Sequence, residues 1–164
     1  MTLNISDDKR AEYFRRSYEA IDGLWFMTLE EEFDFERALE FDQRVWKIVP
    51  KIQARKAREL FGISGDGLTA LKEALEIKFA IEGAGCEIHL AGEGKLTVEL
   101  SACPWFLLMQ KSGRAHLAGR VGEAICGTEY PVWAKEFGCK EFTHLRRKIC
   151  SGDEKCLLEF MENA

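Results

Sequence analysis

The spacing of apolar residues in this chain changes near residue 86, and this change constrains the fold more than any other feature. Upstream, apolar residues recur every three or four positions, as on one face of a helix. The runs 86–91 and 95–100 instead alternate apolar and polar residues, which indicates strands with one buried face. Gly92-Glu93-Gly94 separates the two runs and is typical of a hairpin turn. A helical region is therefore followed by an antiparallel hairpin.

The first half of the chain predicts three helices, at 7–22, 28–60 and 68–80. Gly23 is expected to end the first of them, because glycine is common just past a helix. Pro50 falls inside the second and is expected to kink or split it, since proline has no amide hydrogen to donate.

Side chains within these helices support the assignment. Phe14, Tyr18 and Ile21 share one face of the first helix. Thr28 and Glu31 form the pattern of a capping box at the start of the second. We expect most of the larger aromatic side chains to be in the core, with several able to line an apolar ligand pocket between helices and sheet: Trp25, Phe26, Trp46, Trp105, Tyr130 and Trp133.

The second half predicts further helices and a closing hairpin. The helices are expected at 104–111, 115–125 and 131–137, and the hairpin pairs 141–149 with 156–161 across a turn. These elements predict an α+β fold in which the two hairpins form one antiparallel sheet. We expect a single domain over 1–164, with a helical N-terminal part at 1–65 and a hairpin-helices-hairpin part at 66–164.

Composition limits the functions to be considered. Apolar residues make up 46% of the 164 residues and charged residues 31%, a balance typical of globular proteins. The net charge of −5 argues against a dedicated nucleic-acid-binding protein, which would need clustered Lys and Arg. The polar N-terminus is unlike a targeting peptide, and no apolar run reaches the roughly 20 residues of a membrane span. We therefore expect a cytoplasmic protein with no membrane partner.

Six cysteines are many for a chain in a reducing compartment, where they indicate metal binding or catalysis more often than disulfides. Cys103 precedes Pro104 at a predicted helix start, where free amides and the helix dipole favour a thiolate. Such a thiolate is a candidate nucleophile or metal ligand, and a buried cysteine at a strand end is an equal alternative. Cys86 is most simply a core residue, and the sequence leaves Cys139 ambiguous.

Three further cysteines could share a site with Cys103. Cys126 lies near the predicted end of a helix, and Cys150 and Cys156 flank the turn of the closing hairpin. Tetrahedral zinc takes four Cys or His ligands, often delivered in pairs across a short turn. His144 is another candidate, either as a ligand or as a catalytic base, although a polar surface histidine is the more common case. We expect the four cysteines to converge at one end of the sheet.

A β-hairpin, helices with a cysteine and a final hairpin that carries Cys…Gly-Asp-x-x-Cys-x-x-Glu-Phe resemble the vinyl-4-reductase-type small-molecule-binding domain. The motifs CPWF, GEAICG and CSGDEKC are also similar to proteins related to L-2-amino-thiazoline-4-carboxylic acid hydrolase. The resemblance covers about residues 66–162. In the sensor members of the first family, a zinc ion held by cysteines and a carboxylate braces a pocket for an aromatic ligand. The resemblance matches Cys126 to the helix cysteine and Cys156 to the last hairpin cysteine, while Cys150 is shifted by two residues.

The resemblance implies a domain that binds a small molecule, with zinc as the candidate cofactor and Cys103, Cys126, Cys150 and Cys156 as its candidate ligands. The alternative that it implies is a hydrolase acting on a C–N bond, with Cys103 as nucleophile or metal-bound thiolate and His144 or His116 as base. An iron–sulfur protein is a third interpretation, disfavoured because no compact run of cysteines is present. For the oligomeric state, a homodimer is the alternative to a monomer that we consider.

Overall fold

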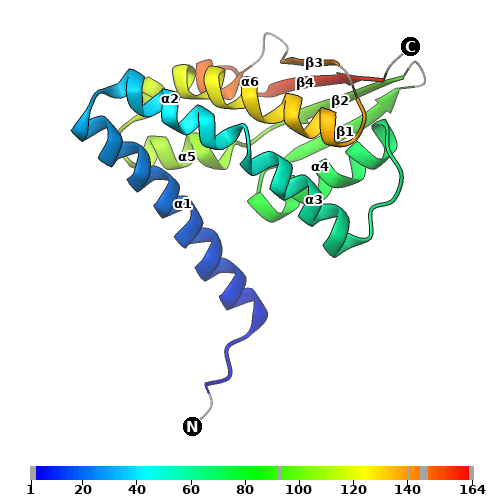
Figure 1. Ribbon diagram of the computed structural model, residues 1–164, viewed down its shortest axis with the longest axis horizontal. Helices are drawn as coiled ribbons and strands as arrows, with labels where there is room; N and C mark the ends of the chain where they lie inside the picture. The colour runs from blue at the N-terminus through cyan, green and yellow to red at the C-terminus, as the bar shows by residue number, and fades with distance from the viewer. Residues whose placement is uncertain (1–2, 92–93, 140, 145–147, 163–164) are drawn as a thin grey trace. The chain divides into compact units, whose positions relative to one another are not determined.

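The fold is α+β, as predicted, with N-terminal helices followed by a four-stranded antiparallel sheet. The structure is a computed structural model that describes residues 3–91, 94–139, 141–144 and 148–162. The strands lie in the order β1-β2-β4-β3, so the two predicted hairpins join into one sheet through β2 and β4 (Figure 1). No helix in these ranges is long and apolar enough to cross a membrane.

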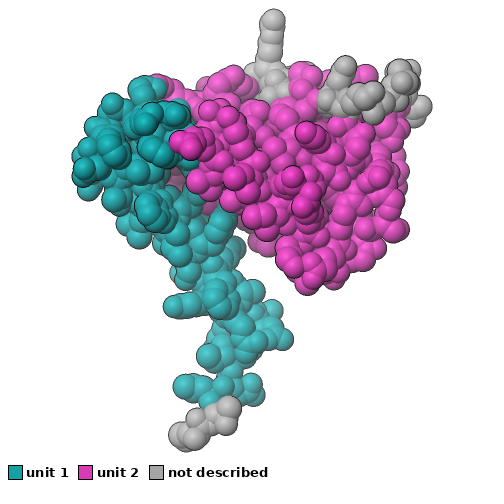
Figure 2. Space-filling view, in the orientation of Figure 1, with its two compact units in different colours: residues 1–42 teal, residues 43–164 magenta. Residues whose placement is uncertain are grey.

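Two compact units divide the chain. The first comprises residues 1–42 and the second residues 43–164, coloured separately in Figure 2. The first unit holds helix α1, Asp7–Glu32, and the first part of α2, Phe35–Trp46. The second unit holds the rest of α2 and everything after it, including the whole sheet and all six cysteines.

Helix α1 does not end at Gly23, so the predicted stop and the capping box after it are wrong. The helix continues through Gly23 to Glu32, and the hydroxyl of Thr28 donates a hydrogen bond to the carbonyl of Leu24, 2.8 Å away, within the same helix. A glycine inside a helix costs only about 1 kcal/mol relative to alanine, which good helix-forming neighbours can offset. The break comes at residues 33–34 instead, where the Asp34 carboxylate accepts a hydrogen bond from the amide of Arg37 at 2.8 Å.

Pro50 splits the predicted second helix, as expected. Helix α2 ends at Trp46, and α3, Val49–Phe61, begins with Pro50 in its first turn, where the missing amide hydrogen has no helical partner to lose. Gly62 ends α3 with a φ of 70°, in the left-handed region that favours glycine. Helix α4, Leu68–Glu82, then forms where the spacing predicted it and runs two residues further than expected.

Both predicted hairpins are antiparallel. Strands β1, Cys86–Ala91, and β2, Lys95–Leu100, pair as expected, although Gly92 and Glu93 of the turn lie outside the described residues. Strand β4, Cys156–Met161, pairs with β2 on one side and with the short β3, Glu141–His144, on the other. Its inward residues are buried, as the alternation predicted: Cys156, Leu158 and Phe160.

The helices between the hairpins differ from the prediction. Helix α5, Pro104–Lys111, forms as expected, and a 3-10 turn, η1, spans Ala115–Leu117. Helix α6 then runs without a break from Ala118 to Glu136, so the predicted helix end at 125 is wrong and Pro131 lies inside the helix. The helical hydrogen bond that Pro131 cannot make is tolerated because the flanking turns are held by the buried side chains of Tyr130 and Trp133.

The core of the second unit lies between the sheet and the helices α3, α4 and α6. Its largest fully buried side chains come from α4, the sheet, α6 and the residue that follows α6: Phe79, Leu71, Leu75, Leu96, Leu158, Phe160, Trp133 and Phe137. Trp46 and Tyr130 are buried as predicted, but Trp25 on α1 is 65% exposed, so its assignment to the core is wrong. Cys139 is a buried core residue, and Cys86 is partly buried against the core.

Candidate functional site

Four cysteines from four separate segments gather at one end of the sheet. Strand register explains part of this, because Leu100 at the end of β2 pairs with Cys156 at the start of β4. Cys103, three residues after Leu100, is the residue before α5 and therefore lies beyond the same end of the sheet. Cys126 lies in the middle of α6, and Cys150 lies in a 3-10 turn, η2, Ile149–Ser151, that packs against α6. We call Cys103, Cys126, Cys150 and Cys156 the thiol cluster.

Members of the thiol cluster lie close enough together to affect the pKa of Cys126 and of Cys156. Burial raises the pKa of Cys126 well above its usual value, and negative charge at Glu129 and at the other three cysteines raises it further. Burial likewise raises the pKa of Cys156, to about 11, with contributions from Cys103 and Cys150. These thiols are therefore protonated at neutral pH unless a cation offsets the cost of ionising them.

Cys103 has a mixed environment. Burial raises its pKa, while the backbone amides of Phe106 and Trp105 in the first turn of α5 act to lower it. The sulfur therefore faces the free amides of the helix start, as the sequence predicted, but burial outweighs them. The pKa of the thiol stays above its usual value, which leaves Cys103 a weak nucleophile at neutral pH.

Glycine allows the η2 turn to approach α6 closely. A Cβ atom added at Gly122 would lie 2.6 Å from the sulfur of Cys150, which is closer than real Cβ contacts. Gly119, one turn earlier, lies against the carbonyl of the same cysteine, 3.5 Å from where its Cβ would be. Across the turn, the amide of Ile149 donates a hydrogen bond to the sulfur of Cys156 at 3.2 Å. The η2 turn thus lies against α6 and also contacts the start of β4 without a covalent bond, and all six cysteines are free thiols.

A buried group of charges lies next to the thiol cluster. Lys78 from α4 contacts Glu82 on the same helix, with Nζ–O distances of 2.6 and 2.7 Å, and Glu129 on α6, with Nζ to Oε1 at 3.0 Å. Lys78 and Glu129 are both buried, at 7% and 5% exposed. Glu129 lies three residues after Cys126, one turn along α6, and so joins the charged group to the thiol cluster.

The ionisation of this charged group follows from its surroundings. Burial alone would lower the pKa of Lys78, but the carboxylates of Glu129 and Glu82 outweigh it and raise the pKa. Burial raises the pKa of Glu129, which Lys78 and Trp133 lower in part. Among the described residues, neither the indole N–H of Trp133 nor Oε1 of Glu129 has a partner in hydrogen-bond geometry, although Lys78 lies close to that oxygen. The interior therefore holds two carboxyl groups and one ammonium group, and Lys78 and Trp133 both act on Glu129 as hydrogen-bond donors.

The described residues do not form a completed metal site. No three of their Cys, His, Asp and Glu side chains are arranged to hold a metal ion together. His144 is the last residue of β3 and pairs with Leu158 of β4, but its side chain lies outside the described atoms. His116 is exposed in η1. The structure thus brings the four cysteines into one region and leaves the role of His144 as a prediction.

Sequence reasoning missed the buried charged group. A signal was present, because Leu71, Leu75, Lys78 and Glu82 follow one another at helical spacing and share the apolar face of α4. A lysine on such a face is almost never fully buried unless it is paired. Its second partner, Glu129, could not be identified from the sequence, since it comes from a helix 51 positions away in the chain.

Comparison with known proteins gives a family and no function. The comparison with curated proteins finds no match. A family model matches residues 8–151, which include Cys103, Cys126 and Cys150 and end just before β4. Because the match covers most of the chain, the protein belongs to a family of unknown function, DUF6125.

Proposed function

We propose that the second unit is a small-molecule-binding domain braced by a zinc ion that the thiol cluster holds. The main support for the proposal is that four cysteines, separated by up to 53 positions in the chain, come together from the residue before α5 and from α6, η2 and β4, and that the other three all raise the pKa of Cys126. Thiols are the donors that zinc prefers in structural sites, and four of them match its usual number of ligands. The donor chemistry of the cluster therefore fits zinc.

Zinc would supply the positive charge that the cluster lacks. Burial and mutual repulsion raise the pKa values of Cys103, Cys126 and Cys156, so ionising them without a cation is unfavourable. The ion would tie the start of α5, α6 and the closing hairpin together. Reduced thiols are needed for this, which is why the proposal places the protein in the cytoplasm.

The small-molecule part of the proposal is supported by the polar atoms next to the thiol cluster. Binding sites for small molecules combine apolar walls with a few polar groups that orient the ligand. Glu129 and Trp133 act on each other inside the core, and Lys78 lies beside them with rings of Phe79 and Tyr130 within 5.1 and 6.0 Å of its ammonium group. A ligand with both a hydrogen-bond donor and an acceptor fits this set.

Metal analysis of the full chain, purified without chelator, tests the proposal. We expect about one zinc per chain, because the cluster offers one set of four ligands. Cys126→Ser and Cys156→Ser should lose the metal, whereas the matched control Cys86→Ser should retain it, since the charges that act on Cys86 do not include the other cysteines. A metal-free wild-type protein, or iron with the brown colour of a cluster, would contradict the proposal.

A hydrolase is the second candidate, because the amides of Phe106 and Trp105 act to lower the pKa of Cys103 even though burial outweighs them. In that case Cys103→Ser should abolish hydrolysis of a C–N bond in an amino-thiazoline carboxylate while leaving the zinc content and melting temperature unchanged. If Cys103 is instead only a metal ligand, the same substitution should lower the zinc content, and no such hydrolysis should be found in the wild type.

A further inference from the structure

We propose that helix α1 docks against α1 of a second copy of this chain, in antiparallel orientation, through one exposed apolar stripe. The stripe consists of Phe14, Tyr18, Ile21 and Trp25, which are 63%, 38%, 57% and 65% exposed. No residue of α1 is buried, although the helix is 26 residues long. This inference does not depend on the thiol cluster or on the proposed function.

The spacing of the stripe is that of a helix pair. Its members follow one another at intervals of 4, 3 and 4 residues, as the a and d positions of a heptad do. Residues at these intervals form a narrow seam along one side of a helix, which suits a single partner helix. A helix seam of this kind is self-complementary, because the same residues can interdigitate across a two-fold axis.

The exposed area is close to what a dimer needs. Aromatic side chains bury about 150–250 Å² each when they are covered. With neighbouring Leu24, which is 58% exposed, the stripe presents on the order of 600 Å² per chain. Standard protein interfaces bury about 800 Å² on each partner.

Charges along the stripe favour an antiparallel pair over a parallel one. Arg15 and Asp22 are seven residues apart and border the same side of the stripe, so an antiparallel partner brings each Arg15 to Asp22 of the second copy. A parallel partner would instead bring Arg15 to Arg10 of the second copy, which is unfavourable.

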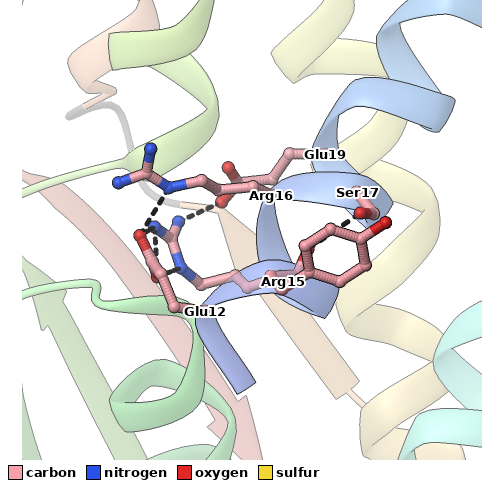
Figure 3. Close-up of polar contacts among 6 residues, drawn as sticks. Glu12, Arg15, Arg16, Ser17 and Glu19 are labelled. Atoms are coloured by element: carbon pink, nitrogen blue, oxygen red, sulfur yellow. Dashed lines mark hydrogen bonds and ion pairs between the residues drawn. The ribbon is translucent and has the colours of Figure 1, made fainter. Parts of the chain in front are cut away.

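Contacts within the helix hold Arg15 in place for this role. Its guanidinium donates hydrogen bonds to both oxygens of Glu12, at 2.9 and 3.0 Å, and to Glu19, while Arg16 also binds Glu12 (Figure 3). These bonds raise the pKa of Arg15, with the Glu12 bond as the largest cause. The Arg15 side chain is therefore held in position beside the stripe before a partner binds, which reduces the conformational entropy lost on docking.

Sedimentation equilibrium of the full chain tests the apolar part. The wild type should be a dimer at about 100 μM. Ile21→Glu and Trp25→Glu should each raise the dimer Kd roughly 100-fold or more, because each places a charge in the seam of both copies. Leu60→Glu is the matched control, since it introduces the same charge at a leucine on α3 that is 71% exposed, and it should leave the Kd unchanged. A wild-type monomer at that concentration, or equal weakening by the control, would overturn the proposal.

A charge exchange tests the orientation without touching the seam. Arg15→Glu and Asp22→Arg should each raise the dimer Kd about tenfold, since two symmetric pairs become repulsive. The double variant should return to the wild-type Kd, because it restores both pairs with their signs reversed. Circular dichroism should show wild-type helix content in all three. A double variant weaker than either single one would overturn the antiparallel arrangement, as would a monomeric wild type whose α1 binds anionic vesicles instead.

Discussion

Helices α1 and α4 use their side chains in opposite ways. Helix α1 exposes aromatic residues, among them Trp25 at 65% and Phe14 at 63%. Helix α4, which is 11 residues shorter, buries a lysine together with its apolar residues. Lys78 on α4 is thus better shielded from water than Trp25 on α1. Residue type alone would have assigned these two side chains the other way round.

The exposure of Lys78 and Trp25 shows that the burial of a side chain depends on what covers its helix face. The inner face of α4 is covered by β1, β2 and α3. Lys78 can remain in this interior because Glu82 and Glu129 neutralise and hydrogen-bond its ammonium group. Substitutions on covered and on uncovered helix faces should therefore differ in their effect on the free energy of unfolding.

Removing the buried cation should give the largest loss of stability. Lys78→Met leaves Glu82 and Glu129 without a positive partner in the interior, which should lower the free energy of unfolding by about 3–5 kcal/mol. Chemical denaturation measures this change in the free energy of unfolding. Lys72→Met is the matched control, because Lys72 pairs with Glu76 at the same i, i+4 spacing on the exposed side of α4, and it should cost about 1 kcal/mol or less. A Lys78→Met protein as stable as the Lys72→Met control would show that the contacts of Lys78 with Glu82 and Glu129 do not stabilise the fold.

Truncating one apolar side chain in α1 and one in α4 should change the free energy of unfolding by different amounts. Leu71→Ala on α4 removes a fully buried side chain and should lower the free energy of unfolding by about 2–4 kcal/mol. Ile21→Ala on α1, where the side chain is 57% exposed, should change it by about 0.5 kcal/mol or less when measured far below the Kd of the proposed dimer. Equal losses at the two sites would mean that the Ile21 side chain is covered in the monomer.

Adding a methyl group at two helical glycines should have effects of opposite sign. Gly122→Ala would press against the sulfur of Cys150 and should lower the free energy of unfolding by about 1–2 kcal/mol. Gly23→Ala meets no atom within 4 Å and should instead raise the helix content and stability of α1, by about 0.5–1 kcal/mol. Thermal denaturation followed by circular dichroism reports both. Stabilisation by Gly122→Ala would show that η2 does not approach α6 as described.

Alkaline pH should weaken the second unit. Burial raises the pKa values of Cys139 and Cys156 from 9.0 to about 11. A folded-state pKa above the unfolded value means that the stabilising contribution is complete below pH 9 and is lost as the pH rises towards 11. The loss for Cys156 should be about 1 kcal/mol once solvent screening is included.

Melting curves recorded from pH 8 upwards measure this loss, and Cys156→Ala should make them less steep. Saturating zinc should have the same effect, since a zinc-bound thiol is already deprotonated in the folded protein. A melting temperature that stays level through this range would contradict the buried, protonated state of these thiols.

Local patterns predicted most of the elements, and they failed where packing overrides local preference. The alternation around β1 and β2, the split at Pro50 and the start of α5 at Pro104 were all correct. Gly23 was wrongly assigned as a helix end, because it lies inside a helix whose neighbouring turns are favourable, and the predicted helix end at 125 falls inside α6. The side chains of Tyr130 and Trp133 likewise hold α6 together across Pro131.

The candidate site was predictable in kind but not in its surroundings. The sequence identified Cys103, Cys126, Cys150 and Cys156 as a possible group, and the strand register then placed two of their segments at one sheet end. Their ionisation could not be predicted, because the pKa of a thiol depends on the atoms that surround it in space. Cys126 illustrates this, since a carboxylate one helical turn away and three distant thiols all act on it.

The amino-acid sequence is enough to predict the periods of the hydrophobic pattern, and hence the α+β class, the two hairpins and most of the apolar stripe along α1. These properties depend on residues that are near one another in the chain. Only the tertiary structure decided which faces are covered, that Lys78 meets Glu129, and that Gly122 lies against Cys150. Each of these contacts joins positions far apart in the chain, and it forms only when the sheet and its helices pack, because that packing fixes which distant side chains share the interior.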